Sequence, residues 1–178
     1  MTVFSASTFV CSTIIFCMLQ MPIQAKKKVS KRKIVIHGLV TETSSYCGGA
    51  QPSEELLEEL RKPLAKANKL IYIKRGSANN ENAKVMYTAT TDEDGKFAIS
   101  LPVGYTYCFV EEWKSKPFTI PKNTEFVKWD VDCLKARYKE GDYVLQVKKK
   151  NNSLVKINYH TPCFYKPYCG DYSGPLPP

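Results

Sequence analysis

Short runs of β-branched and aromatic residues recur along the chain from residue 33 onward, and turn residues separate them. These runs predict strands at 33–41, 70–73, 84–90, 96–101, 105–111, 143–148 and 154–159. In the run 105–111, aromatic residues at every second position alternate with smaller residues, which is the period of a strand with two distinct faces. Regularly spaced strands of this kind are typical of an antiparallel β-sandwich, so we predict a mainly β fold.

The turn residues predict how neighbouring strands are joined. Asp94 and Gly95 lie between two strand runs and favour a hairpin, because both residues tolerate positive φ. The runs 143–148 and 154–159 are expected to form a last hairpin around a polar tip. The tail 161–178 is rich in Pro, Gly and Tyr, so we expect an irregular C-terminal tail.

One segment, 53–62, has a clear helical pattern. Leu56, Leu57 and Leu60 share one face, and Ser53 can cap the first turn. Pro63 follows directly and ends the helix. The sequence therefore predicts one short inserted helix within the β fold.

The first 25 residues carry no charged side chain and include an apolar stretch at 9–19. This stretch is shorter than the roughly 20 residues that span a bilayer, but it suits the central part of a signal peptide. With Ala25 as the cleavage site, residues 1–25 are interpreted as a signal peptide and the mature chain as exported to the periplasm or beyond. Basic residues follow the stretch rather than precede it, so an uncleaved N-terminal anchor is the alternative.

The formal net charge of +9 would by itself suggest a nucleic-acid-binding protein. Six of the 26 basic residues lie at 26–33, however, and the remaining 20 against 17 acidic residues leave only +3. We interpret 26–32 as a solvated basic leader, with binding to phosphates or an anionic membrane as the alternative. No specific nucleic-acid partner is expected.

The chain has seven cysteines, and their number bears on the redox compartment in which the protein folds. Five of them follow the expected cleavage site. An odd number leaves at least one thiol free or paired between chains. Cys108 lies in an apolar strand run, where a free cysteine behaves as a small buried hydrophobe. We therefore expect disulfides among Cys47, Cys133, Cys163 and Cys169, with the connectivity left open.

Few residues suggest catalysis or metal binding. The chain has no His-Glu-x-x-His, Gly-x-Ser-x-Gly or Gly-rich phosphate loop, so we predict no catalytic residue, metal or cofactor. His160 with Cys133, Cys163 and Cys169 offers zinc ligands as an alternative, but no CxxC pair accompanies them. His37 and His160 are expected to be structural, and the acidic turn 92–95 has too few ligands for an EF-hand.

Two turn segments, 91–97 (TDEDGKF) and 101–107 (LPVGYTY), resemble the carboxypeptidase regulatory-like domain, a transthyretin-like β-sandwich. The segment 36–40 (IHGLV) resembles the first strand of that family, and 62–65 (KPLA) with 70–73 (LIYI) resembles the second. The resemblance covers about 33–112 and extends to prealbumin-like and collagen-adhesin B-type modules. The chain also looks like small exported bacterial proteins that carry this domain.

The resemblance implies a sandwich core at 33–112, of the transthyretin-like or Ig-like kind, with 47–62 as a helical insertion and 113–178 as a C-terminal extension. It does not imply peptidase activity, because in carboxypeptidases this domain is an accessory. In collagen-adhesin modules a Glu can promote a Lys–Asn isopeptide bond, and Glu111 or Glu112 with Lys33 and Asn158 would be the matching residues. The expectation from the residues themselves is that both Glu side chains are solvated.

We therefore expect a non-enzymatic exported module with a binding or structural role at the cell envelope, where its partner would be a protein or a glycan. The alternative is a carbohydrate- or peptide-binding accessory domain that uses Tyr165, Tyr168 and Tyr172 of the tail as contacts. Packing of these rings onto the sandwich is the simpler expectation. A His/Cys metal-binding protein is a third interpretation.

Overall fold

The computed structural model describes residues 32–150 and 154–176, so the predicted signal peptide and basic leader at 1–31 lie outside the described residues. The elements in chain order are β1 (Lys33–Ser44), α1 (Glu54–Arg61), β2 (Leu64–Ala65), β3 (Leu70–Arg75), β4 (Val85–Thr90), β5 (Lys96–Pro102), β6 (Thr106–Val110), α2 (Glu112–Ser115), β7 (Val127–Trp129), α3 (Val131–Lys139), β8 (Tyr143–Gln146), β9 (Val155–Thr161) and β10 (Gly170–Tyr172).

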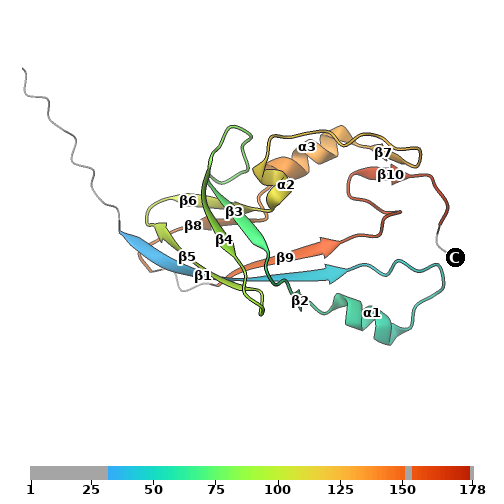
Figure 1. Ribbon diagram of the computed structural model, residues 1–178, viewed down its shortest axis with the longest axis horizontal. Helices are drawn as coiled ribbons and strands as arrows, with labels where there is room; N and C mark the ends of the chain where they lie inside the picture. Colours follow the sequence, from blue (N-terminus) through green and yellow to red (C-terminus); the bar gives the residue numbers. More distant parts are fainter. Residues whose placement is uncertain (1–31, 151–153, 177–178) are drawn as a thin grey trace, which may run out of the picture. The chain divides into compact units, whose positions relative to one another are not determined.

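The fold is mainly β and is built as a sandwich, which confirms the predicted fold class (Figure 1). In one sheet, β1 pairs with β2, β5 and β9, and we call this the β1 sheet. In the other, which we call the β3 sheet, the order β4-β3-β6-β8 is antiparallel throughout. β7 and β10 form a separate antiparallel pair.

The inner faces of the two sheets meet in one hydrophobic core. Its buried residues are Ile36, Val40, Phe97, Leu101, Val155 and Ile157 from the β1 sheet, and Ile71, Ile73, Ala89, Tyr107, Phe109 and Leu145 from the β3 sheet, with Val147. In β1, β5 and β9 the buried residues alternate with more exposed ones, as expected for sheets that bury one face. In β6 both faces are buried, because the chain from α2 onward covers the outer side of Cys108 and Val110.

Both predicted hairpins are wrong, because their strands lie in different sheets. The turn 92–95 closes tightly, and the Asp92 N–H donates to the Lys96 carbonyl at 2.8 Å. Beyond the turn, β4 pairs with β3 whereas β5 pairs with β1. In the same way β8 pairs with β6 whereas β9 pairs with β1. The turn at 92–95 was predicted correctly. The two strands of each expected hairpin nevertheless lie in opposite sheets, because this arrangement buries their apolar faces against each other.

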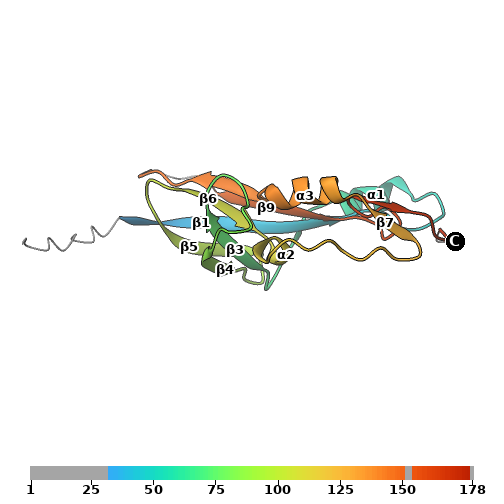
Figure 2. The ribbon, with the colours of Figure 1, turned by 90° about the horizontal axis from the view of Figure 1, so that it is seen from above.

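The pairing of β9 with β1 is parallel, although the pattern predicts only antiparallel strands. β1 and β9 run side by side in both views (Figure 1 and Figure 2). Thr43 lies opposite His160, and Ser44 lies opposite Thr161. The two strands therefore end together, which brings residues 45–47 next to residues 161–163.

The predicted helix is present as α1. The Ser53 hydroxyl accepts a hydrogen bond from the Leu56 N–H at 3.2 Å, and Pro63 follows the helix. None of its residues is buried, so the leucine face does not reach the core.

Two further helices, α2 and α3, were not predicted. The Asp130 side chain caps α3 by accepting from the N–H groups of Asp132 and Cys133, each at 3.0 Å. Leu134 and Tyr138, four residues apart, are its buried residues. One apolar pair in nine residues is a weak periodic signal, which is why the pattern missed this helix. No helix in the described parts of the chain is both long and apolar enough to cross a bilayer.

We predict that Gly95→Ala destabilises the fold more than Gly104→Ala. Both glycines have positive φ, which costs a residue with a Cβ about 1–2 kcal/mol. An added Cβ at Gly95 would lie 3.0 Å from the Lys66 nitrogen and close to the Val40 carbonyl, whereas one at Gly104 would meet nothing within 4 Å. Urea unfolding should therefore give a loss of about 1 kcal/mol for Gly104→Ala and at least twice that for Gly95→Ala. Equal losses would contradict this account of the turn.

Candidate functional site

A cleft of about 860 Å³ lies between α2, α3 and the segments 116–121 and 160–168. We call it the outer cleft. Both tryptophans of the chain line it. The aromatic and proline residues of its lining are Trp113, Pro117, Phe118, Pro121, Trp129, Pro162, Phe164, Pro167 and Tyr168. The outer cleft is therefore largely a surface of rings.

A smaller pocket of about 290 Å³ adjoins the outer cleft, and we call it the inner pocket. The two share Lys69, Glu111, Arg137, His160, Thr161 and Tyr168. The inner pocket is otherwise lined by Glu42, Lys66, Asp142, Asn158 and Tyr159. The outer cleft is thus lined mainly by rings, and the inner pocket mainly by charged and polar groups.

The aromatic wall on the α2 side is held by Tyr138, which is buried in α3. Its hydroxyl donates to the Lys116 carbonyl at 2.8 Å. Its ring contacts Phe118 and Trp113, with centroids 5.2 Å and 6.0 Å away. The Trp113 indole N–H also donates to Glu111 at 2.5 Å. These contacts fix the orientation of Trp113 before any ligand binds.

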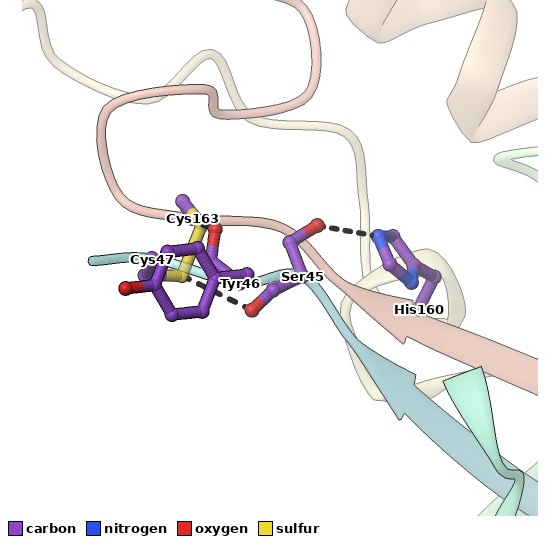
Figure 3. Close-up of a disulfide and its surroundings, with 5 residues drawn as sticks. All are labelled: Ser45, Tyr46, Cys47, His160 and Cys163. Carbon is purple, nitrogen blue, oxygen red and sulfur yellow. Dashed lines mark hydrogen bonds between the residues drawn. A yellow bond between two sulfur atoms is a disulfide. The ribbon is translucent and has the colours of Figure 1, made fainter. Parts of the chain in front are cut away.

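The opposite wall begins where β1 and β9 end together. His160 of β9 is within hydrogen-bonding distance of the Thr43 hydroxyl through Nδ1, at 3.1 Å, and of the Ser45 hydroxyl through Nε2, at 2.8 Å. Cys47 and Cys163 form a disulfide one step further along, as Figure 3 shows. The parallel pairing therefore sets the position of the wall, and the disulfide closes it covalently.

A second disulfide joins Cys133 of α3 to Cys169. Next to it the Asp130 N–H donates to the Cys169 carbonyl at 2.8 Å, and β7 pairs with β10. Among the cysteines that the structure describes, the four selected from the sequence are thus paired, and Cys108 is a free, buried thiol. Bonded sulfurs are not thiolates, so the zinc site suggested by Cys133, Cys163 and Cys169 does not form.

The carboxylate of Asp142, which lines the inner pocket, connects the two walls. Its Oδ1 accepts from the Lys114 ammonium at 2.6 Å, and its Oδ2 accepts from the Glu111 N–H at 2.6 Å and the Tyr159 hydroxyl at 3.2 Å. Lys114 and Asp142 expose only 6% and 9% of their side chains. Burial, and then the Asp142 and Glu111 carboxylates, raise the pKa of Tyr159, which keeps this hydroxyl protonated as a donor.

A second buried lysine reinforces the same region. Lys74 of β3 donates to the Asn79 side chain at 2.8 Å and to the Lys114 carbonyl at 3.1 Å. Burial lowers the pKa of Lys74. Asn79 in turn donates to the carbonyls of Lys114 and Tyr138, both at 2.9 Å. This network attaches α2 and α3 to the outer side of the β3 sheet.

Of the three tyrosines predicted as ligand contacts, Tyr168 lines both the outer cleft and the inner pocket. Tyr165 packs against Phe164, and Tyr172 packs against Phe164 and Phe126. Sequence reasoning missed Trp113, Trp129 and Arg137. The only signal for the tryptophans was their rarity, because 113–129 carries no clear periodic pattern.

The isopeptide alternative is wrong for this chain. Lys33 pairs with Pro102, whereas Asn158 pairs with Thr41, eight residues further along β1, so the two side chains are too far apart to react. In the acidic turn 92–95, the Asp92 carboxylate is used by the turn itself, since it accepts hydrogen bonds from the N–H groups of Asp94 and Lys96. His37 lies on an exposed position of β1.

The chain matches no protein-family model and no curated protein. The resemblance to the carboxypeptidase regulatory-like domain therefore stays a prediction. The two disulfides indicate an oxidising compartment, because thiols are kept reduced in the cytosol.

We predict that Cys108 resists alkylation in the native protein. Its side chain is fully buried, and burial raises its pKa to about 11, so neither access nor thiolate is available at pH 8. Iodoacetamide without reductant should label Cys108 only after guanidinium chloride is added, as located by peptide mapping. The same map should show the Cys47–Cys163 and Cys133–Cys169 peptides. Labelling of any of these four cysteines would contradict the assigned pairing.

We also predict that Asp142→Asn is strongly destabilising. It leaves the Lys114 ammonium buried without its counter-charge, and breaking a buried ion pair costs about 3–5 kcal/mol. The matched control is Glu112→Gln in α2, which removes the exposed partner of Lys116, the residue after the helix, and should leave the urea midpoint unchanged. Equal midpoints for the two variants would show that the buried pair does not hold this region.

Proposed function

We propose that the protein is an exported, non-enzymatic β-sandwich module that binds a glycan of the cell envelope in the outer cleft. The observation that carries the proposal is that both tryptophans of the chain line one cleft together with Phe118, Phe164 and Tyr168. Aromatic faces bury the apolar faces of sugar rings, and neighbouring polar groups bind the hydroxyls.

The lining favours a glycan over a peptide. A peptide bound in extended form takes much of its affinity from main-chain hydrogen bonds to the site. Four lining positions are prolines, which have no N–H to offer. The Phe118 N–H is already donated to Glu81 at 3.2 Å. Recognition in the outer cleft would therefore rest on side chains, which suits sugar rings.

The absence of catalysis is supported by the way the titratable groups are used. The ring nitrogens of His160 face the hydroxyl groups of Thr43 in β1, at 3.1 Å, and of Ser45 directly after it, at 2.8 Å. Glu42 is bound by Lys66 and by the Thr161 hydroxyl, and the Lys66 hydrogen bond is the main cause of its lowered pKa. Asp142 holds Lys114. Each of these groups has a partner within the fold, which fits the structural roles that we propose for them.

Export is supported by the disulfides and by the apolar stretch at 9–19, although that stretch lies outside the described residues. The proposed membership of the carboxypeptidase regulatory-like family rests on the sandwich and on the turn segments 91–97 and 101–107. In that family the domain accompanies other activities, which agrees with a binding role.

The test is a glycan array followed by tryptophan fluorescence titration of each hit. We expect binding to change the fluorescence, since both reporters line the outer cleft. Trp113→Ala should weaken binding by about tenfold or more, because the variant loses the apolar area buried against the sugar together with the roughly 1 kcal/mol that ring stacking adds.

The matched control is Tyr165→Ala, which removes a tail ring that packs on Phe164 but does not line the outer cleft. It should bind as the wild type does. An array without hits, or a Trp113→Ala variant of unchanged affinity, would overturn the proposed function.

A further inference from the structure

The charges that line the inner pocket are not all used by the fold. Its three carboxylates each have a lysine partner: Glu42 pairs with Lys66, Glu111 lies 3.7 Å from Lys69, and Asp142 lies 2.6 Å from Lys114. Arg137 is the remaining cation of the lining. Within 32–150 and 154–176, it has no carboxylate within 4.0 Å.

Arg137 is held in place by a ring rather than by an acid. Its guanidinium carbon lies 3.5 Å from the centroid of Tyr168. The Tyr168 hydroxyl donates to the His160 carbonyl at 3.1 Å, and the edge of the ring meets His160. Stacking uses the face of a guanidinium and leaves the N–H groups at its edge free to bind a carboxylate in a two-pronged manner.

The position of Arg137 is the junction between ring-binding and polar surfaces. It lines the outer cleft and the inner pocket, and so does Lys69. A sugar ring stacked in the outer cleft would therefore carry its exocyclic group towards two cations, one of them without an anion.

We infer that the inner pocket is a carboxylate subsite and that the ligand is an acidic glycan, one that contains uronic acid residues. This inference rests on the proposed function and adds the chemical class of the ligand. Arg137 binds the sugar carboxylate through its free N–H edge, and Tyr168 positions Arg137. Lys69 places a second cation beside Arg137, and its ammonium lies 3.7 Å from Glu111, which is an ion pair beyond hydrogen-bonding distance.

The experiment compares acidic oligosaccharides with their methyl esters, which keep the ring and remove the charge. The probes are oligomers of galacturonate, glucuronate and mannuronate, titrated by tryptophan fluorescence. We expect at least one acid to bind about tenfold or more tighter than its ester, because a charge-assisted pair is worth about 1.5–3 kcal/mol. Arg137→Gln should remove that preference while the ester binds as before.

Two variants serve as controls. Arg137→Lys keeps the positive charge but loses the two-pronged guanidinium edge, so it should retain only part of the preference for the acid over the ester. Arg75→Gln removes an arginine that stacks on Tyr105 at 3.7 Å but does not line the outer cleft or the inner pocket, and it should leave the preference intact.

The outcomes separate the inference from the proposed function. Acids and esters that bind equally, or a preference that survives Arg137→Gln, would overturn the carboxylate subsite. Neutral glycans that bind through Trp113 with no response to acids would also overturn it, while the proposed function stands. If no acid, ester or neutral glycan changes the fluorescence, both fail.

Discussion

The candidate site depends on the hydrogen bonds that the Asp142 carboxylate accepts. Their donors are the Glu111 N–H, the Lys114 ammonium of α2 and the Tyr159 hydroxyl of β9. One buried anion therefore joins both sheets to the segment that covers them. A charge buried this deeply must be paired and hydrogen-bonded, or its cost would exceed what the surrounding packing provides. The position of α2, and with it Trp113, follows from this requirement.

The same constraint explains why charged residues lie behind a β-sheet. The outer face of the β3 sheet buries Lys74, and the α2 segment buries Lys114, where apolar residues would have packed more simply. Each ammonium instead reaches carbonyls of a different element: Lys74 reaches that of Lys114, and Lys114 reaches that of Glu140. Directional bonds of this kind fix the α2–α3 segment in one arrangement, which a cleft with preorganised walls needs.

The sequence predicted the sandwich well and the cleft poorly, for one physical reason. In strands such as β1 and β5 apolar and polar residues alternate, so the sequence shows which face is buried. The helix α1 can be recognised from its capping residue Ser53 and its leucines. The cleft is made by segments with little periodicity, held by buried lysines and by a parallel pairing between strands more than a hundred residues apart. A local sequence pattern predicts neither the buried lysines nor the parallel pairing. A lysine such as Lys114 is expected to be exposed, and the paired strands are far apart in the sequence. The free Cys108 could be foreseen, because its place in an apolar strand was a local property.

The disulfides lie where the hydrophobic core is absent. The core residues all belong to the two sheets and the short segment after β8, whereas the described residues from α2 to α3 and from 162 onward bury little apolar surface beyond Leu134, Tyr138 and Cys163. Segments that bury so little apolar surface need crosslinks to stay ordered. Cys47–Cys163 supplies one at the lining of the outer cleft, and Cys133–Cys169 supplies the other between α3 and the tail. The sandwich has a hydrophobic core of its own, whereas the segments around the outer cleft depend on crosslinks that persist only in an oxidising compartment.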